Sequence, residues 1–577
     1  MPEYPRQELP DATKWDHTKW SPNYRNDNRI ETHESGTAPC KTACPAHVAV
    51  QGYLKLAAQG RYDEALALIK RENPLPAICG RVCNRRCEDA CTRGRVDAAV
   101  AIDEVKKFIA QRDLDAATRY VPPVVTPTRA GGFDQKIAII GAGPAGLSCA
   151  FYLAEKGYKP VVFEKNERPG GMLTYGIPSF KLQKDVIEAE VEVIRLMGAE
   201  FRYGVEVGRD VTLNELREQG FKAFYVAIGC QGGRLAGIPG EDAEDVTVAV
   251  DFLREVNSGK IDSLSGRTIV VGGGNVAIDV ARNACRLGSE HVEMFCLESE
   301  AQMPASEEER REAIEDGAHI SCGWGPKEVH LDESGRVCGI TFKRCTRVFD
   351  DEGRFAPEYD ENDLRRVDAD RVVMSIGQSI VWGDLLAGSK VELGRGQGAL
   401  ADPQTYQTAE PDIFVGGDVY TGPSFAIDAI AAGHEAAVSI HRFVQPGSTL
   451  TIGRNQRRYT ALDRDDVVIE SYDNASREAA HVDREREKAA PFSEYVETFT
   501  EEQVRAETAR CLGCGASIVD PNKCIGCGLC TTKCAFDAIH LYRDRPECST
   551  MVKYEQKLPS LGKYALKRAI KIKFGRK

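Results

Sequence analysis

Twelve of the 20 cysteines of this 577-residue chain lie in two short arrays near opposite ends of the sequence. The arrays are Cys40, Cys44, Cys79, Cys83, Cys87 and Cys91, and Cys511, Cys514, Cys524, Cys527, Cys530 and Cys534. Closely spaced cysteine thiolates are the usual ligands of iron–sulfur clusters, and twelve of them would hold three 4Fe-4S clusters. Two dinucleotide fingerprints lie between the arrays. This combination indicates electron transfer, in which a flavin splits the two electrons of a hydride and clusters carry them away singly.

The first fingerprint, Gly141-x-Gly143-x-x-Gly146, follows a predicted strand (KIAII) and opens a predicted helix. Its glycines permit a tight turn and the close approach of a pyrophosphate to the helix N-terminus. Glu164 ends the next predicted strand, where its carboxylate can accept hydrogen bonds from an adenosine ribose. Strand, helix and terminal acid together predict a dinucleotide site.

A second fingerprint predicts a second nucleotide site, and its residues are Gly272, Gly274, Asn275 and Ala277. Two sites in one chain imply two different cofactors. The segment RPGGMLTYGIP, with Gly171 and Met172, follows the first unit, and Gly417-Asp418 precedes a later predicted helix. In flavoproteins with two dinucleotide domains, such a late Gly-Asp contacts the ribityl and pyrophosphate groups. We therefore expect FAD at the first site and a nicotinamide nucleotide at the second.

Glu298 lies at the end of the second strand of the second unit, where an NADPH site needs Arg or Lys to balance the 2′-phosphate. A carboxylate there would repel that phosphate and bind a free 2′-hydroxyl, so the sequence favours NADH. Arg310 and Arg311, in the following predicted helix, could reverse this preference.

The C-terminal array contains Cys524-x2-Cys527-x2-Cys530-x3-Cys534, the bacterial ferredoxin run for a 4Fe-4S cluster. A zinc site is disfavoured, because three cysteines at two-residue gaps are too crowded around one ion but can reach separate corners of a cubic 4Fe-4S cluster. Cys511 and Cys514 begin a similar run upstream, but the next slot is Ser517. The fourth cysteine of a ferredoxin run often serves a neighbouring cluster, so Cys548 is an alternative to Cys534.

Composition limits the class of protein. The net charge of −12 argues against nucleic acid as the main partner, and the hydrophobic share of 42% is ordinary. The polar N-terminal residues show no targeting signal. The uncharged run 137–154 is long enough to suggest a membrane span, but the fingerprint inside it indicates a strand, a turn and a helix. We expect a cytoplasmic protein, where reducing conditions favour metal ligation over disulfides.

The predicted fold is α/β, with an NAD domain inserted in an FAD domain, both of Rossmann type, a helical iron–sulfur domain before them and a ferredoxin-like domain after them. The expected divisions are a polar arm (1–38), the helical iron–sulfur domain (39–122), a linker (123–133), the FAD domain (134–232 and 371–445), the NAD domain (233–370), a strap or linker (446–500), the ferredoxin-like domain (501–550) and a basic tail (551–577). The arm is a free tail or wraps a partner, and the basic tail is solvated or docks on an acidic partner.

Three segments together resemble the small subunit of bacterial glutamate synthase: PCKTACPAHV, CGRVCNRRCEDAC and GGMLTYGIP. They are also similar to the N-terminal half of dihydropyrimidine dehydrogenase and to the large subunit of NADH-dependent ferredoxin:NADP oxidoreductase. The resemblance covers about residues 38–445. It implies that FAD exchanges hydride with NAD(P)H, and that two 4Fe-4S clusters in the helical domain pass electrons to a partner.

The chain departs from that family in two places. The family has a Cys-Leu-x-Cys upstream of Cys40, whereas here a matching ARCLGC stands at 509–514. The family's Glu or Gln cluster ligand aligns near Lys106, which cannot serve, so Cys79 or Glu104 would replace it.

These departures suggest a ligand layout. Cys511 and Cys514 fold back to join Cys40 and Cys91 around one cluster. The second cluster uses Cys44, Cys83 and Cys87 with Cys79 or Glu104, and the third uses Cys524, Cys527 and Cys530 with Cys534 or Cys548. In the rival layout, Cys511 and Cys514 join Cys534 in a second local ferredoxin cluster.

The expected function is NADH oxidation, or its reverse, through FAD, with electrons leaving through three clusters to other redox subunits or to a ferredoxin. No side chain is needed as an acid or base in this chemistry. Electron bifurcation inside a larger complex is compatible with the sequence. The alternatives are the small subunit of a glutamate synthase, and a non-catalytic relay subunit with degenerate nucleotide sites.

Overall fold

The computed structural model describes residues 7–8, 36–125, 132–467, 469, 472–515, 524–528, 530–531, 539, 541–543 and 553–574. The chain forms two compact units, one of residues 36–515 and one of residues 1–35 with 516–577. The first unit contains both nucleotide fingerprints and eight of the twelve array cysteines.

The first fingerprint belongs to a parallel sheet with the strand order β16-β5-β2-β3-β4. Its strands are β2 (Lys136–Ile140), β3 (Val161–Glu164), β4 (Glu200–Tyr203), β5 (Phe221–Val226) and β16 (Ile413–Val415). The helices of this domain are α7 (Pro144–Glu155), α8 (Met172–Tyr175), α9 (Lys184–Leu196), α10 (Leu213–Glu218), α14 (Asp418–Thr421) and α15 (Ala426–Val444). Apart from Lys136 and Lys222, the residues of the central strands β2, β3 and β5 are buried, as expected for a parallel sheet covered by helices.

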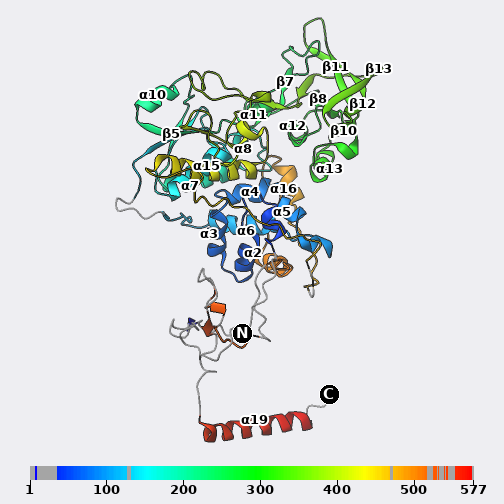
Figure 1. The fold of residues 1–577 in the computed structure, drawn as a ribbon. Coiled ribbons are helices and arrows are strands. Elements are labelled where there is room, and N and C mark those ends of the chain that lie inside the picture. The colour runs from blue at the N-terminus through cyan, green and yellow to red at the C-terminus, as the bar shows by residue number, and fades with distance from the viewer. Residues whose placement is uncertain are drawn as a thin grey trace. The chain divides into compact units, whose positions relative to one another are not determined.

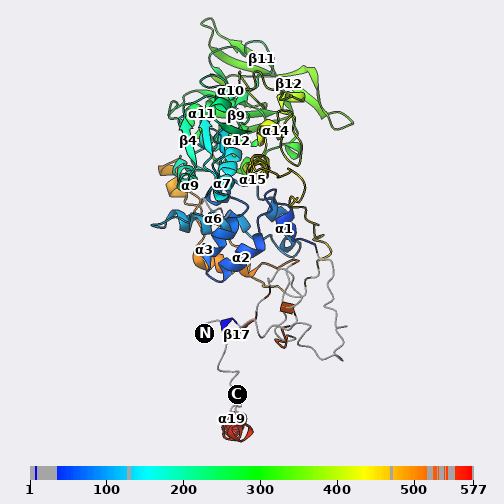
Figure 2. The same ribbon diagram turned by 60° about the vertical axis from the view of Figure 1, so that its left-hand side comes forward.

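Helices α7 and α15 lie side by side in Figures 1 and 2, although about 280 residues separate them in sequence. Gly433 permits this contact, because a Cβ atom there would lie 2.2 Å from the carbonyl oxygen of Ala145. The close crossing brings the later half of the domain, with Gly417-Asp418, against the first fingerprint.

The second fingerprint belongs to another parallel sheet, with the order β10-β9-β8-β14-β7. Its strands are β7 (Val246–Val248), β8 (Arg267–Val271), β9 (His291–Cys296), β10 (His319–Cys322) and β14 (Arg371–Met374), with helices α11 (Ala249–Asn257), α12 (Asn275–Arg286) and α13 (Glu307–Glu315). An antiparallel sheet packs beside it, made of β11 (Trp324–Leu331), β12 (Val337–Phe349) and β13 (Phe355–Val367). Strands β6 (Gly232–Gly233) and β15 (Gln378–Ser379) pair where the chain passes between the two domains.

The position of β14 differs from the sequence-based division at residue 370. The segment RVVMSIG was grouped with the FAD domain, but β14 pairs with β7 and β8 in the second sheet. The residues of a short buried strand are compatible with either sheet, and only its hydrogen-bonded neighbours show which sheet it joins.

The first cysteine array lies in a helical domain that packs against the first sheet domain (Figure 1). Its helices are α1 (Pro39–Thr42), α2 (Val50–Ala58), α3 (Tyr62–Lys70), α4 (Pro76–Val82), α5 (Arg86–Asp89) and α6 (Ile102–Leu114). Cys40, Cys79 and Cys87 lie on these helices, and Cys44, Cys83 and Cys91 lie just beyond helix ends.

The segment after α15 crosses the surface of both domains. It contains α16 (Arg484–Ala489) and α17 (Glu501–Ala509). The Arg457 guanidinium bonds the backbone oxygen of Ala46, and the Tyr495 hydroxyl accepts a hydrogen bond from Arg282 at 2.7 Å. Helix α17 packs on α2 and α6. Residues 501–515 therefore belong to the unit 36–515, although the sequence-based division grouped them with the ferredoxin-like domain.

The other unit contains a two-stranded pairing of β1 (Gln7–Glu8) with β17 (Tyr542–Arg543) and the helix α19 (Tyr554–Phe574). The expected basic tail is thus helical over these 21 residues. Cys534 and Cys548 lie outside the described residues. Among the described helices, none has the length and apolarity that a membrane crossing requires.

Candidate functional site

The first fingerprint forms an open turn at the carboxyl end of β2. Gly141 has a positive φ of 104°, and a Cβ atom there would lie 2.5 Å from the carbonyl oxygen of Ala227. A Cβ atom on Gly146 would collide with the carbonyl oxygen of Gly141. Gly143, in contrast, has open space on its side-chain face. Two glycines thus close the turn, and the third leaves room at the helix N-terminus for a pyrophosphate.

Glu164 lies beside this turn and is 3% exposed. Its carboxylate accepts hydrogen bonds from the backbone N–H groups of Ala142, at 2.8 Å, and Asn166, at 2.9 Å. The side chain also lines a pocket with Gly141, Lys165 and Trp382. Glu164 therefore holds the shape of the turn in addition to facing the position expected for a ribose.

The other residues expected at the flavin meet at the same helix end. A Cβ atom on Gly171 would lie 3.1 Å from the Cα of Gly143, and one on Gly417 would lie 3.0 Å from the Cβ of Ala145. Met172 begins α8 directly after this contact. Burial raises the pKa of Asp418 to about 6, and its carboxylate accepts a hydrogen bond from the backbone N–H of Ser424. The structure thus brings Gly171 and Gly417, which the sequence assigns to FAD, against the first fingerprint.

The second fingerprint repeats this geometry. Gly272 has a φ of 141°, a Cβ atom there would lie 2.3 Å from the Ser375 carbonyl oxygen, and Gly274 has open space on its side-chain face. Ala277 is fully buried, as close packing of helix on strand requires. Asn275 accepts a hydrogen bond at Oδ1 from the backbone N–H of Ser306, which ties the start of α12 to the start of α13.

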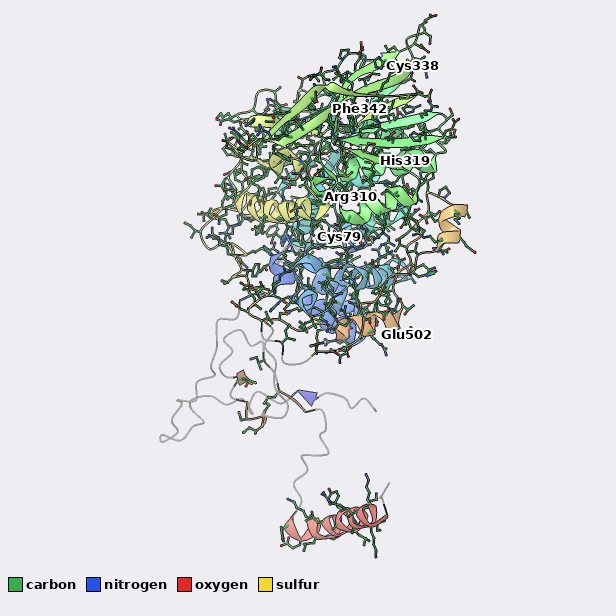
Figure 3. All side chains as sticks on the ribbon, turned by 90° about the vertical axis from the view of Figure 1, so that its right-hand side faces the viewer. Cys79, Arg310, His319, Cys338, Phe342 and Glu502 are labelled. Carbon is green, nitrogen blue, oxygen red and sulfur yellow. The ribbon has the colours of Figure 1, made fainter. Side chains whose placement is uncertain are left out.

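Glu298 faces this second turn. A Cβ atom on Gly273 would lie 3.0 Å from Glu298 Oε2. Arg310, labelled in Figure 3, donates from Nη1 to the backbone oxygen of Glu300 at 2.6 Å, and its buried Nε has no hydrogen-bond partner among the described residues. Arg311 is exposed and pairs with Glu315. The Glu298 carboxylate therefore lies next to the glycine turn, whereas Arg311 pairs with Glu315.

Four cysteines from both arrays line one pocket, which we call thiol group A: Cys40, Cys91, Cys511 and Cys514. Burial raises the pKa of Cys40, and the other three thiols raise it further because their charges are close. Gln51 donates from Nε2 to the backbone oxygen of Cys514 at 2.6 Å. The two ends of the chain therefore bring their thiols to one place.

Arg510 fixes the C-terminal segment of group A. Its side chain is fully buried, pairs with Glu507 at 2.6 Å and with Asp97 at 2.9 Å, and donates to the backbone oxygens of Ala98 and Ala99. Glu507 also accepts from the backbone N–H of Ala101 at 2.7 Å. A buried ion pair that is fully hydrogen-bonded specifies one arrangement of its surroundings. It therefore holds Cys511 at the pocket.

The remaining cysteines of the first array form a second set, which we call thiol group B: Cys44, Cys79, Cys83 and Cys87. Cys79 lies on α4, Cys83 ends that helix, and Cys87 lies on α5. Burial raises the pKa of Cys79, Cys83 and Cys87, and neighbouring thiols raise it further, with Cys83 acting on Cys79 and Cys87, and Cys44 acting on Cys83. Burial is the largest cause in all three.

Lys106 is the buried cation of group B. It is 6% exposed and forms an ion pair with Asp103. Its positive charge lowers the pKa of Cys79, Cys83 and Cys87 against the effect of burial. The resemblance implied only that Lys106 cannot be a ligand; in the structure Lys106 pairs with Asp103 and lies close enough for its charge to act on three thiols of group B.

Glu104, the alternative fourth ligand of group B, has other neighbours. Its pKa is raised by burial and lowered by Lys107 and Arg85, with Arg85 Nη2 at 3.8 Å from Oε1. Its Oε2 has no hydrogen-bond partner among the described residues. Cys79 or Glu104 stays the predicted fourth ligand of group B.

Group B borders the flavin domain. Arg86, adjacent to Cys87, forms a two-pronged ion pair with Asp428 in the first turn of α15, at 2.9 and 3.1 Å. Figure 3 labels Cys79 between α15 and the helices of the cysteine domain. Group B therefore lies on the side of the helical domain that contacts α15 of the first sheet domain.

Of the ferredoxin run, the structure describes Cys524, Cys527 and Cys530, the first two exposed and the third partly buried. They belong to the unit of residues 1–35 and 516–577. Their relation to groups A and B and the position of Cys534 lie outside what the structure describes.

The donor chemistry suits clusters better than single ions. One zinc ion needs four ligand atoms about 2.3 Å from a common centre. In the described part of the chain, no three His, Cys, Asp or Glu side chains meet as ligands of one ion. A four-iron cube instead takes one thiolate at each well-separated corner. Four cysteines that line a pocket without converging on a point fit that requirement.

Three family models match the chain. The pyridine nucleotide-disulphide oxidoreductase model matches residues 135–433. A model described as dihydropyrimidine dehydrogenase domain II, 4Fe-4S cluster, matches residues 31–118. A 4Fe-4S binding domain model matches residues 517–540. These matches confirm the predicted fold class, with iron–sulfur segments before and after two dinucleotide domains.

Three curated relatives illustrate the similarity. The NADP(+)-dependent formate dehydrogenase subunit beta of Moorella thermoacetica is 35% identical over 513 residues, covering 83% of this chain and 70% of that protein. The glutamate synthase (NADPH) small chain of Escherichia coli (strain K12) is 35% identical over 431 residues, covering 71% and 89%. The NAD-dependent dihydropyrimidine dehydrogenase subunit PreT of Escherichia coli O157:H7 is 32% identical over 411 residues, covering 71% and 91%. The resemblance read from the sequence is confirmed, as are FAD, a pyridine nucleotide and iron–sulfur clusters as cofactors.

Proposed function

The chain belongs to the pyridine nucleotide-disulphide oxidoreductase family, and on that premise we propose that it passes electrons between NADH and the redox subunits of a larger complex, or a ferredoxin, through FAD and three 4Fe-4S clusters. The observation that carries this proposal is thiol group A, in which Cys40 and Cys91 share a pocket with Cys511 and Cys514. Such a pocket completes a second cluster site in the helical domain, beside group B.

The residues of the chain bind and orient the cofactors in this proposal. FAD supplies the conversion between a hydride and single electrons. The glycine turns at Gly141 and Gly272 bring the backbone close to the two pyrophosphates. Asp418 and Gly171 border the flavin site, and Glu298 borders the second nucleotide. Groups A and B hold the clusters of the helical domain, and the ferredoxin run holds the third.

NADH is the proposed nucleotide because Glu298 stands beside the second glycine turn. Its carboxylate would accept a hydrogen bond from a ribose hydroxyl and repel a 2′-phosphate. The relatives differ in this respect, since their names include both NADP(+)-dependent and NAD-dependent enzymes. The preference therefore rests on this chain's own residues.

The partner is proposed to be a redox subunit. Both the formate dehydrogenase subunit beta and the glutamate synthase small chain are named as parts of larger enzymes. The glutamate synthase alternative is favoured by the match over 71% of this chain. The segment 517–540, with its own 4Fe-4S model, and the 83% coverage by the formate dehydrogenase subunit favour a longer electron chain instead.

Anaerobic reduction with NADH tests the proposal. The purified chain should contain about one FAD and about twelve irons. NADH should bleach the flavin absorbance and produce EPR signals of reduced clusters. Flavin bleaching with no cluster signal at any NADH concentration would refute the relay, and zinc in place of iron would refute the cluster sites.

A further inference from the structure

Two cysteines that are far from both arrays come together in the second nucleotide domain. Cys296 ends β9 and Cys322 ends the neighbouring strand β10, whose first residue, His319, is labelled in Figure 3. The two residues are register partners in the parallel pairing, and their Sγ atoms are 3.7 Å apart. The sequence shows no sign of this, because 25 residues separate them and neither lies in a motif.

The pair flanks the backbone that carries Glu298. Cys296 donates a weak hydrogen bond from Sγ to the backbone oxygen of Glu298 at 3.7 Å, and the N–H of Gly323 donates to the same oxygen at 3.0 Å. A Cβ atom on Gly273, inside the second fingerprint, would lie 2.9 Å from the Cβ of Cys296. A change at the Cys296 sulfur therefore acts directly on the edge of the nucleotide turn.

We propose that Cys296 and Cys322 form a reversible disulfide, by exchange with a small-molecule disulfide, and that this bond weakens nucleotide binding at the second fingerprint. Neighbouring strands are about 4.8 Å apart, and disulfides span Cα distances of about 4.4–6.8 Å. The sulfurs need to close from 3.7 Å to the bond length of about 2.05 Å. Closure removes the thiol hydrogen that now bonds the Glu298 carbonyl.

The exchange is balanced in two steps. The thiolate of Cys322, which is partly exposed, attacks one sulfur of the small-molecule disulfide and releases one thiol. Cys296, which is 3% exposed, then loses its proton, and its thiolate attacks the Cys322 sulfur and releases the second small thiol as a thiolate, which takes up a proton. The two cysteines lose two protons and two electrons, and the small disulfide gains them. A dithiol reagent reverses both steps.

The test uses the full-length, cofactor-loaded chain without oxygen, so that the clusters persist. Glutathione disulfide is added, free thiols are blocked, and peptides are mapped by mass spectrometry. We expect a cross-linked peptide pair containing Cys296 and Cys322. The pair should be absent in Cys322→Ser and present in Cys345→Ser, a nearby buried cysteine whose Sγ donates to Arg347. Glutathione attached to Cys322 with no cross-link would overturn the proposal.

Nucleotide binding is measured on the same samples, and this second part rests on the proposed function. The dissociation constant of NADH should rise about tenfold on oxidation and return after dithiothreitol, with the iron content unchanged. Oxidised Cys322→Ser should bind as before. An unchanged constant in the cross-linked protein would overturn the effect on binding. A protein that binds no nucleotide in either state would instead contradict the proposed function, because the cross-link is mapped independently.

Discussion

At the scale of single residues, two charged side chains at the candidate sites each carry a specific prediction. Glu298 stands at the second glycine turn, and Lys106 stands among three thiols of group B. Glu298 is half-buried and Lys106 is buried. Removing or reversing the charge of Glu298 should therefore change nucleotide affinity, and removing that of Lys106 should change the cluster potential. One substitution tests each prediction.

Glu298→Arg should shift the nucleotide preference toward NADPH, because a guanidinium would pair with the 2′-phosphate that the carboxylate repels. Stopped-flow bleaching of the flavin with each nucleotide measures the ratio of rates, which should change by about 100-fold or more, since like and unlike charges differ by several kcal/mol. Arg311→Ala serves as the control and should leave the ratio unchanged, since Arg311 pairs with Glu315. A wild-type preference for NADPH would show that Arg310 controls the site.

Lys106→Met should make the potential of the group B cluster more negative. Without this buried positive charge, the cluster is harder to reduce. The expected shift is on the order of tens of millivolts, because the Asp103 carboxylate already offsets part of the Lys106 charge. An EPR-monitored redox titration measures this potential. Lys107→Met is a matched control, because Lys107 instead pairs with Glu494 at 2.7 Å. Equal shifts in both variants would mean that the charge of Lys106 has no specific role.

At the scale of elements, helix α17 and the turn after it carry half of the ligands of group A. Arg510 should be the critical residue of this element. Arg510→Met leaves Glu507 buried without its partner, which costs about 3–5 kcal/mol. The variant should lose the group A cluster, seen as a fall of about four irons per chain. Arg505→Met should keep all of its iron, since Arg505 is exposed and forms its ion pair with Glu501, away from the thiols. Loss of iron in both variants would contradict a specific role for Arg510.

The elements also show how far sequence reasoning reaches. The glycine turns follow from local rules, since Gly141 and Gly272 must adopt positive φ values, and their strands and helices follow from apolar patterns. The ARCLGC segment suggested the position of Cys511 by likeness to a family motif. The sheet that β14 joins, the position of Lys106 near the thiols of group B and the contact of Cys296 with Cys322 depend on tertiary neighbours, and local patterns do not encode them.

At the scale of the whole molecule, the account depends on one long-range closure, in which the segment after α17 returns to the helical domain and completes a cluster. The direct measurement is iron content with EPR spin counting on three full-length variants: Cys40→Ser with Cys91→Ser, Cys511→Ser with Cys514→Ser, and all four substitutions together. If the four cysteines hold one cluster, each variant loses the same EPR signal and retains about eight irons, and the fourfold variant loses no more than either pair. If the fourfold variant retains only about four irons, the two pairs serve different clusters and the closure is contradicted.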